Sequence, residues 1–262
     1  MRGGRLIIAV VIALISAVTY FSTTSDNPLT GEKQRVALTP EQEIALGYKS
    51  APEMAAQMGG LSRNREAAAL VQRIGERLAR QSIAAKSPYK FSFNVLADPK
   101  TINAFALPGG PIFITEGLLR ALKSEAQVAA VLGHEIGHVI ARHSSERLAK
   151  QQLTQGLLGA LIVGTGDYST AQIGQVVGGM ISMKYGREDE LESDALGIRI
   201  LAEAGYDPRA MIAVMETLAK ASGGSRQPEF MSTHPAPENR AERIRAEIQK
   251  RFPDGVPKGL AK

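Results

Sequence analysis

The sequence has no cysteine and no tryptophan, and only four of its 262 residues are histidine. Without thiolates the chain cannot form a disulfide framework or a cysteine-ligated zinc site, and it cannot be anchored as a lipoprotein. Any metal must therefore be held by His, Asp or Glu. The net charge is only +5, and the basic residues are scattered rather than interleaved with aromatic ones. We therefore expect no nucleic-acid partner.

The chain also lacks a hydrophobic run long enough to span a bilayer comfortably. The uncharged stretch from Leu6 to Phe21 would cover about 24 Å as a helix, against a hydrocarbon core of about 30 Å. Two arginines precede it, so residues 1–24 are typical of a signal peptide or an N-terminal membrane anchor. Tyr20 stands where a cleavage site needs a small residue, which favours an uncleaved anchor. We predict an exported, periplasmic protein that contacts the inner membrane through residues 6–21 if it is uncleaved.

With 44% hydrophobic residues, the chain can bury a sizeable core without cross-links. We expect a linker over 25–38, one domain over 39–252 and a C-terminal tail over 253–262. Caps and helical periodicity predict a mainly helical chain, and alternating apolar residues predict a few short strands. Helices are expected at 39–58, 64–81, 116–122, 125–147, 188–204, 208–220 and 237–251, and strands at 91–97, 103–107 and 111–115.

The most informative motif is His134-Glu135-Ile136-Gly137-His138. Two histidines four residues apart on a helix point the same way and can hold one metal ion, while the glutamate between them is placed to act on water. This is the helix signature of zinc metalloproteases. The alternative is two surface histidines on an amphipathic helix. The apolar residues on both sides of the motif argue against it, because they are typical of a buried helix.

A catalytic zinc needs a third protein ligand. His143 lies about 180° around the helix from His134 if the helix continues, so it is expected either to support the ligands without touching the metal or to have a structural role. Glu190 and Asp194, four apart on a later helix, are better candidates. One carboxylate can ligate the metal and the other can accept the N–H of a ligand histidine. Alone, this acidic stretch would be interpreted as a solvated charged face.

Several motifs together resemble the M48 metallopeptidases. They are Gly133-His134-Glu135-Ile136-Gly137-His138, Arg187-(x2)-Glu190-(x3)-Asp194, Thr233-His234-Pro235, and the segment Asn103-Ala104-Phe105-Ala106-Leu107-Pro108-Gly109-Gly110. The similarity covers about 39–243 and is greatest to periplasmic members with one anchor or none. One departure is Gly186, where members often have Ser; we expect it to leave metal ligation unaffected.

The resemblance implies an α+β fold, mainly helical and zincin-like, with a small β-sheet beside the active-site helix. It implies one Zn²⁺ on His134, His138 and Glu190, with Asp194 behind the ligands and Glu135 as the general base. His234 is expected either to fill the fourth zinc position as a gate or to be an ordinary loop histidine.

The remaining expectations concern the residues around that site. Arg240 is expected to stabilise the transition state or to pair with a site carboxylate. An edge strand, either Ile112–Thr115 or its partner Asn103–Leu107, is expected to bind extended peptides by β-augmentation.

Two functions follow from this site and the export signal. The first is a zinc endopeptidase that degrades misfolded or misassembled cell-envelope proteins. The second is a chaperone-like factor for outer-membrane protein assembly whose protease activity is latent. The glycine-rich apolar segment Gln151–Gly186 is interpreted as a lid, a membrane contact or ordinary core.

Overall fold

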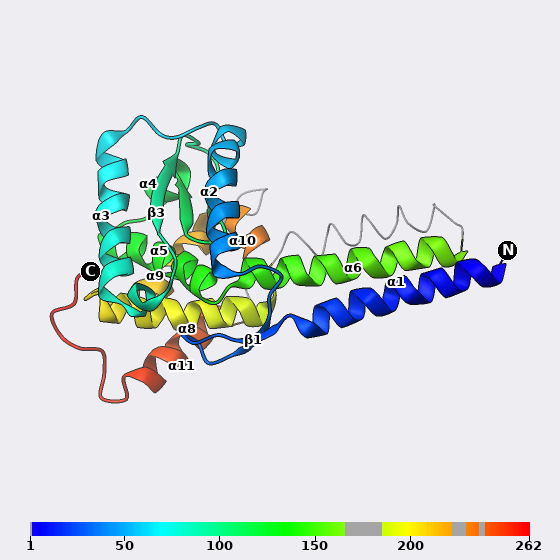
Figure 1. The fold of residues 1–262 in the computed structure, drawn as a ribbon. Coiled ribbons are helices and arrows are strands. Elements are labelled where there is room, and N and C mark those ends of the chain that lie inside the picture. Colours follow the sequence, from blue (N-terminus) through cyan, green and yellow to red (C-terminus); the bar gives the residue numbers. More distant parts are fainter. Residues whose placement is uncertain (1, 166–184, 222–228, 236–238) are drawn as a thin grey trace. The chain divides into compact units, whose positions relative to one another are not determined.

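The computed structural model describes residues 2–165, 185–221, 229–235 and 239–262, and the chain divides into two compact units. The first unit comprises 1–39 and 142–185, and the second comprises 40–141 and 186–262. Most of the described chain is helical and the sheets are small, so the predicted α+β, mainly helical fold class is confirmed (Figure 1).

The first unit contains two long helices and a short two-stranded sheet. In chain order these are α1 (Arg2–Ser22), β1 (Thr24–Asp26), β2 (Lys33–Arg35) and α6 (His143–Thr165). Strands β1 and β2 pair antiparallel, and α6 contacts both α1 and β2. Much of the segment 151–186, for which a lid, a membrane contact and plain core were considered, lies outside the described residues.

The second unit carries the rest of the described elements. They are α2 (Pro40–Gln57), α3 (Arg65–Gln81), the 3₁₀ helix η1 (Ile83–Lys86), β3 (Ser92–Leu96), β4 (Ala104–Ala106), β5 (Pro111–Thr115), α4 (Glu116–Ala121), α5 (Glu125–Ile140), α8 (Arg187–Glu203), α9 (Ala210–Ala221), α10 (Glu229–Thr233) and α11 (Arg240–Arg251). The predicted start of the last helix, at residue 237, lies outside the described residues.

The three-stranded sheet has the order β3-β5-β4, with β5 parallel to β3 and antiparallel to β4. Because β5 is the central strand, Ile112–Thr115 is not an edge, and that alternative was wrong. The outer strands are β3 and β4, and β4 lies within the other predicted segment. The turn between β4 and β5 contains Gly109 at φ +76°, a left-handed conformation that glycine adopts without strain.

Helix α5 forms the centre of the second unit. Its side chains are buried at every position from Ala126 to Ile140, and it contacts α3, α8, α9 and the strands β4 and β5. It begins at Ser124, whose side chain accepts the N–H of Gln127, as the cap predicted. A helix without a solvent-exposed face must carry apolar residues all round, which is why its sequence is nearly free of charge.

The predicted helix over 125–147 is in fact two helices. Helix α5 ends at Ile140, and Arg142 adopts a left-handed conformation with φ 60° before α6 begins at His143. The angular argument that turned His143 away from the metal assumed a continuous helix, so that argument does not apply. In the structure, the His143 ring lies 6.2 Å from the Tyr185 ring, centroid to centroid.

Candidate metal centre

Four potential metal ligands from three elements meet inside the second unit. They are His134 and His138 on α5, Glu190 on α8 and His234 just after α10, and one ligand atom from each lies within 4.8 Å of the others. Their side chains are at most 3% exposed. The structure thus brings together the three ligands predicted from the sequence and the histidine considered as a gate.

The ligand atoms point at one another. The Nε2 atoms of His134 and His138 are 3.0 Å apart, and each lies 3.4 Å from an oxygen of Glu190. His234 Nδ1 lies 2.9 Å from Glu190 Oε1 and 3.4 Å from His134 Nε2. Two imidazoles and a carboxylate around one point form a donor set that suits Zn²⁺.

Helices α5 and α8 can approach closely because glycines stand at their contact. A Cβ atom added at Gly137 would lie 2.7 Å from Ser193 Oγ and 3.0 Å from Ser193 O. The Ser193 hydroxyl donates a 2.6 Å hydrogen bond to the carbonyl of His134. This contact fixes the position of α8, which carries Glu190, relative to the histidines of α5.

Asp194 and Arg240 stand behind the ligands. Asp194 Oδ1 lies 3.0 Å from His134 Nδ1, the ring nitrogen that faces away from the ligand cluster. The Arg240 guanidinium lies 2.7 Å from each oxygen of Asp194 and 3.0 Å from Glu190 Oε2. Of the two roles considered for Arg240, pairing with a carboxylate is therefore the one that the geometry favours.

The pKa values reflect this concentration of buried charge. Burial lowers the pKa of His134, but its hydrogen bonds with Asp194 and Glu190 outweigh burial and raise the pKa to about 9. Burial raises the pKa of Glu190, but hydrogen bonds with the three histidines hold it well below its usual value. Burial also raises the pKa of Asp194, but the charge of Arg240 and hydrogen bonds with His134 and Arg240 outweigh burial and lower this pKa.

Glu135 differs from the other buried acids. Both of its carboxylate oxygens are buried and have no hydrogen-bond partner among the described residues, although His234 Nε2 lies 3.6 Å from Oε1. Burial raises the pKa of Glu135. An unsatisfied buried carboxylate is costly, so such a group indicates a functional demand for a free acceptor beside the cluster.

The buried charges themselves fit a divalent cation. Three carboxylates, those of Glu135, Glu190 and Asp194, surround a single guanidinium, Arg240, and all four groups are at most 4% exposed. With neutral imidazoles, this leaves two uncompensated negative charges when all three acids are ionised. A bound Zn²⁺ would balance them, and the donor set and charge therefore both fit the metal.

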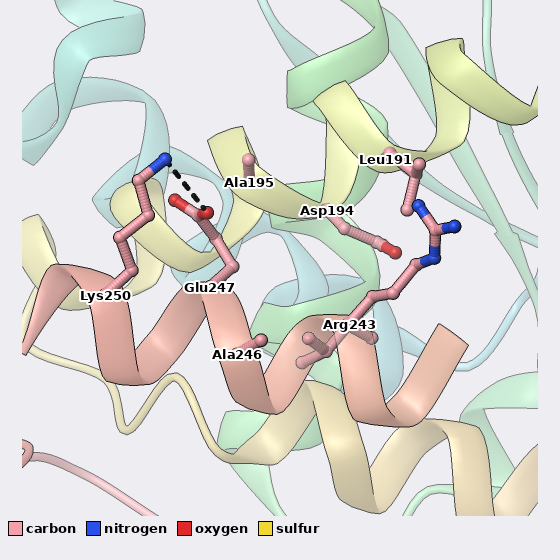
Figure 2. Close-up of a pocket in the computed structure, with 8 residues that line it drawn as sticks. Leu191, Asp194, Ala195, Arg243, Ala246, Glu247 and Lys250 are labelled. Atoms are coloured by element: carbon pink, nitrogen blue, oxygen red, sulfur yellow. Dashed lines mark ion pairs between the residues drawn. The ribbon is translucent and has the colours of Figure 1, made fainter. Parts of the chain in front are cut away.

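An open hollow of about 250 Å³ lies on the far side of Asp194, between α8 and α11. Figure 2 shows Leu191, Asp194 and Ala195 of α8 facing Arg243 and the paired Glu247 and Lys250 of α11. None of the four potential ligands belongs to its lining. The hollow therefore lies beside Asp194, which contacts a ligand histidine, and not beside the potential metal ligands themselves.

The sequence model of peptidase family M48 matches residues 64–248, which include all of these site residues. The chain belongs to peptidase family M48. Its metal centre is accordingly that of a metal-dependent peptidase family, and the resemblance seen in the sequence motifs is confirmed.

Curated relatives agree with this assignment. The chain is 35% identical over 182 residues to the β-barrel assembly-enhancing protease of Escherichia coli K12. This match covers 65% of this chain and 36% of that protein. It is 37% identical over 141 residues to the mitochondrial metalloendopeptidase OMA1 of Arabidopsis thaliana, and this match covers 53% of this chain and 28% of that protein. The chain thus spans about a third of the length of these relatives.

The sequence alone could not have shown how Arg240 and His234 are used. Both lie far along the chain from α5 and α8, and only the fold places them beside these helices. Asn103 was quoted for its family segment alone, yet its side chain donates a 3.2 Å hydrogen bond to Glu229 on α10. Nothing in the local sequence indicates that contact.

Proposed function

We propose that this protein is a zinc-dependent endopeptidase, with the metal on His134, His138 and Glu190 and with Glu135 as general base. The observation that carries the proposal is the free, buried Glu135 carboxylate beside a cluster of two imidazoles and a carboxylate. Its raised pKa favours the same role, because a base works best when its pKa approaches the ambient pH.

Each residue has a defined part in peptide hydrolysis. When bound, the zinc ion would polarise the scissile carbonyl and make a nearby water molecule more acidic. A Glu135 oxygen would accept the proton of that water and later donate it to the nitrogen of the leaving amine. Asp194 would keep the proton of His134 on Nδ1, so that the Nε2 lone pair faces the metal. Arg240 would hold both carboxylates in place.

We propose that β4 binds the substrate. It is an outer strand of its sheet and contacts α5, so a peptide pairing with it would run beside the catalytic helix. Pairing through the backbone reads little of the side-chain sequence. This supports a broad preference for unfolded segments over a defined recognition sequence.

We propose that His234 acts as a gate that fills the fourth metal position. Its ring is seated among the other ligands and stacks on Phe230, with ring centroids 4.4 Å apart. Helix α10 is tied down near β4 as well, since the N–H of Phe230 donates to the carbonyl of Ile102 at 3.1 Å. Movement of His234 out of the cluster would therefore free the fourth metal position. Because α10 would move with it, access of a peptide to β4 would also increase. Replacing His234 by Ala should raise peptidase activity; equal or lower activity would contradict the gate.

We propose a location in the cell envelope, with α1 as an inner-membrane anchor. The uncharged stretch in the sequence is short for a bilayer, but among the described residues the whole helix Gly4–Ser22, with 19 residues, is long and apolar enough to cross a membrane. The tether and the protease domain together suggest misfolded or misassembled envelope proteins as substrates. The name of the E. coli relative, a β-barrel assembly-enhancing protease, supports the same class of substrate.

The test is Glu135→Gln, which keeps the shape of the side chain and removes its basicity. Cleavage of an unfolded model protein should fall by about 10²- to 10⁴-fold while bound zinc, measured by elemental analysis, is retained. The exposed Glu66 on α3 provides the matched control, Glu66→Gln, which should cleave normally. Cleavage by the Glu135→Gln protein at the unmodified rate would refute the proposal.

A second candidate is a chaperone-like assembly factor with latent protease activity. The position of His234 inside the ligand cluster and the assembly function in the name of the relative both favour it. The same Glu135→Gln protein separates the two functions. If it restores envelope integrity in cells that lack the protein, binding rather than cleavage is the main function.

A further inference from the structure

Helices α1 and α6 of the first unit lie side by side and antiparallel (Figure 1). Their contact is tight. A Cβ atom added at Gly156 would lie 2.0 Å from Ser16 Oγ, and one added at Gly164 would lie 3.3 Å from the Cβ of Ala9. Small residues on both helices thus allow close approach over at least two turns, as they do between helices inside membranes.

The paired helices expose a continuous apolar surface. All but three of the exposed large hydrophobic residues in the described structure lie on α1 or on the second half of α6. On α6 these are Leu157 and Leu161, each 45% exposed. Only 6% of the candidate span in α1 is buried, so the contact with α6 leaves most of its surface open to another apolar medium.

The sequence of α6 changes character where it meets α1. The first half contains Glu146, Arg147 and Lys150, whereas the chain from Gln151 to Gly166 has no charged residue. The described stretch from Gly156 to Thr165 is about 15 Å long as a helix and lies within the roughly 30 Å thickness of a hydrocarbon core. It runs antiparallel to α1 from the level of Ser16 to that of Ala9, both within the candidate span.

We propose that the second half of α6, from Gly156 to Thr165, is embedded in the same bilayer as α1 and packs on the anchor as a second membrane helix. The proposal rests on the proposed role of α1 as an uncleaved anchor. The occupant of the exposed apolar face is lipid, because that face continues the surface of α1, whose length and composition suit a bilayer. The packing requires that α1 is retained, since cleavage would remove the partner of Gly156 and Gly164.

The absence of tryptophan makes a direct test possible, because one introduced Trp is the sole indole in the protein. Full-length single-Trp variants would be reconstituted into phospholipid vesicles with or without bromine on the acyl chains. Leu161→Trp reports on α6 and Leu14→Trp on α1, where Leu14 is 59% exposed. Gln57→Trp, at an exposed position of the second unit, gives the aqueous reference.

Bromine should reduce the fluorescence of Leu161→Trp and Leu14→Trp at least two-fold, while Gln57→Trp changes little. Quenching of Leu14→Trp without quenching of Leu161→Trp would overturn the inference and leave the anchor standing. Quenching of neither would refute the anchor itself. Protection of Leu161→Trp from both brominated lipid and aqueous acrylamide would also overturn it, since a protein would then cover the face.

Discussion

At the scale of single residues, the metal centre depends on how closely α5 approaches α8. We predict that Gly137→Ala destabilises the fold by about 1–3 kcal/mol, because the new methyl group would overlap the backbone and hydroxyl of Ser193. It should also lower zinc affinity, since the displaced helix carries Glu190. Urea unfolding and zinc titration would measure both effects.

Gly133 on the same helix is the matched control. A Cβ atom there would meet the flexible end of Leu201 at 3.3 Å, so Gly133→Ala should be nearly neutral or gain from helix propensity. Equal losses for the two alanine variants would show that the approach to Ser193 is not what limits the site.

A second residue-scale prediction concerns Tyr206, whose hydroxyl donates a 2.7 Å hydrogen bond to Glu125, the partner of Arg73. Burial and this carboxylate raise the pKa of Tyr206 to about 12. A raised pKa stabilises the fold fully below the unfolded-state value of about 10, and this stabilisation is lost as the pH rises through 12. Tyr206→Phe should therefore cost about 1–2 kcal/mol at pH 8.

The change in folding stability at low pH follows from the ionisation of Glu125. The hydrogen bond and charge of Arg73 lower its pKa, so its stabilisation is present above the unfolded-state pKa of about 4.3 and is lost as the pH falls further. Chemical unfolding of both proteins between pH 3 and pH 12 would test this. The difference between them should be largest on the plateau and shrink at both ends; a difference independent of pH would contradict the assignment.

How far the sequence predicted the centre differs from residue to residue. His134 and His138 stand four residues apart on α5, and Glu190 and Asp194 stand four apart on α8, so local geometry predicts that each pair shares a helix face. That the two faces meet was implied only by the resemblance to the family. The pairing of Arg240 with Asp194 joins residues 46 positions apart, and it depends on the packing of α11 against α8. Such a contact is a property of the tertiary fold, which helical spacing does not encode.

At the scale of elements, the error at Arg142 has a clear cause. A left-handed residue after a helix is usually Gly or Asn, and neither occurs between Ile140 and His143. The conformation at Arg142 is instead held by tertiary contacts, including a 2.6 Å hydrogen bond from its guanidinium to the carbonyl of Leu38. Helix α3 begins directly after its N-cap residue Asn64, and its bounds were predicted to within one residue.

The pairing of α1 with α6 leads to an element-scale prediction. In a chain without native cysteine, Ala9→Cys combined with Gly164→Cys should form an intramolecular disulfide in membranes, because the two Cβ positions are 3.3 Å apart, close to the usual 3.5–4.5 Å. Ala9→Cys with Gly159→Cys is the matched control, since a Cβ atom at Gly159 has no neighbour within 4 Å among the described residues. Gel mobility without reductant would show the bond.

Equal cross-linking of the two cysteine pairs would mean that α6 rotates freely against α1, and absence of both bonds would mean that the helices separate. Either result would contradict the antiparallel contact, independently of where the bilayer lies.

At the scale of the whole molecule, the sequence predicted the α+β class and the family. The division into a signal peptide or anchor over 1–24, a linker over 25–38, a peptidase domain over 39–252 and a tail over 253–262 stays a prediction. By its contacts the chain separates into a unit with α1 and α6 and a unit with the metal centre. Residues 142–185 interrupt the second unit in sequence, and the uniform helical pattern after His138 does not reveal that boundary.

The metal centre also affects the stability of the whole second unit. Without a metal ion, the buried acids Glu135, Glu190 and Asp194 lie beside Arg240 and His134, and a ligand that binds the folded state alone stabilises it by mass action. Chelation should therefore lower the unfolding temperature by several degrees, and added Zn²⁺ should restore it. Differential scanning calorimetry with and without chelator would measure the shift. His138→Ala, which removes a ligand, should show a much smaller shift, whereas equal shifts in both proteins would place the stabilising metal outside this cluster.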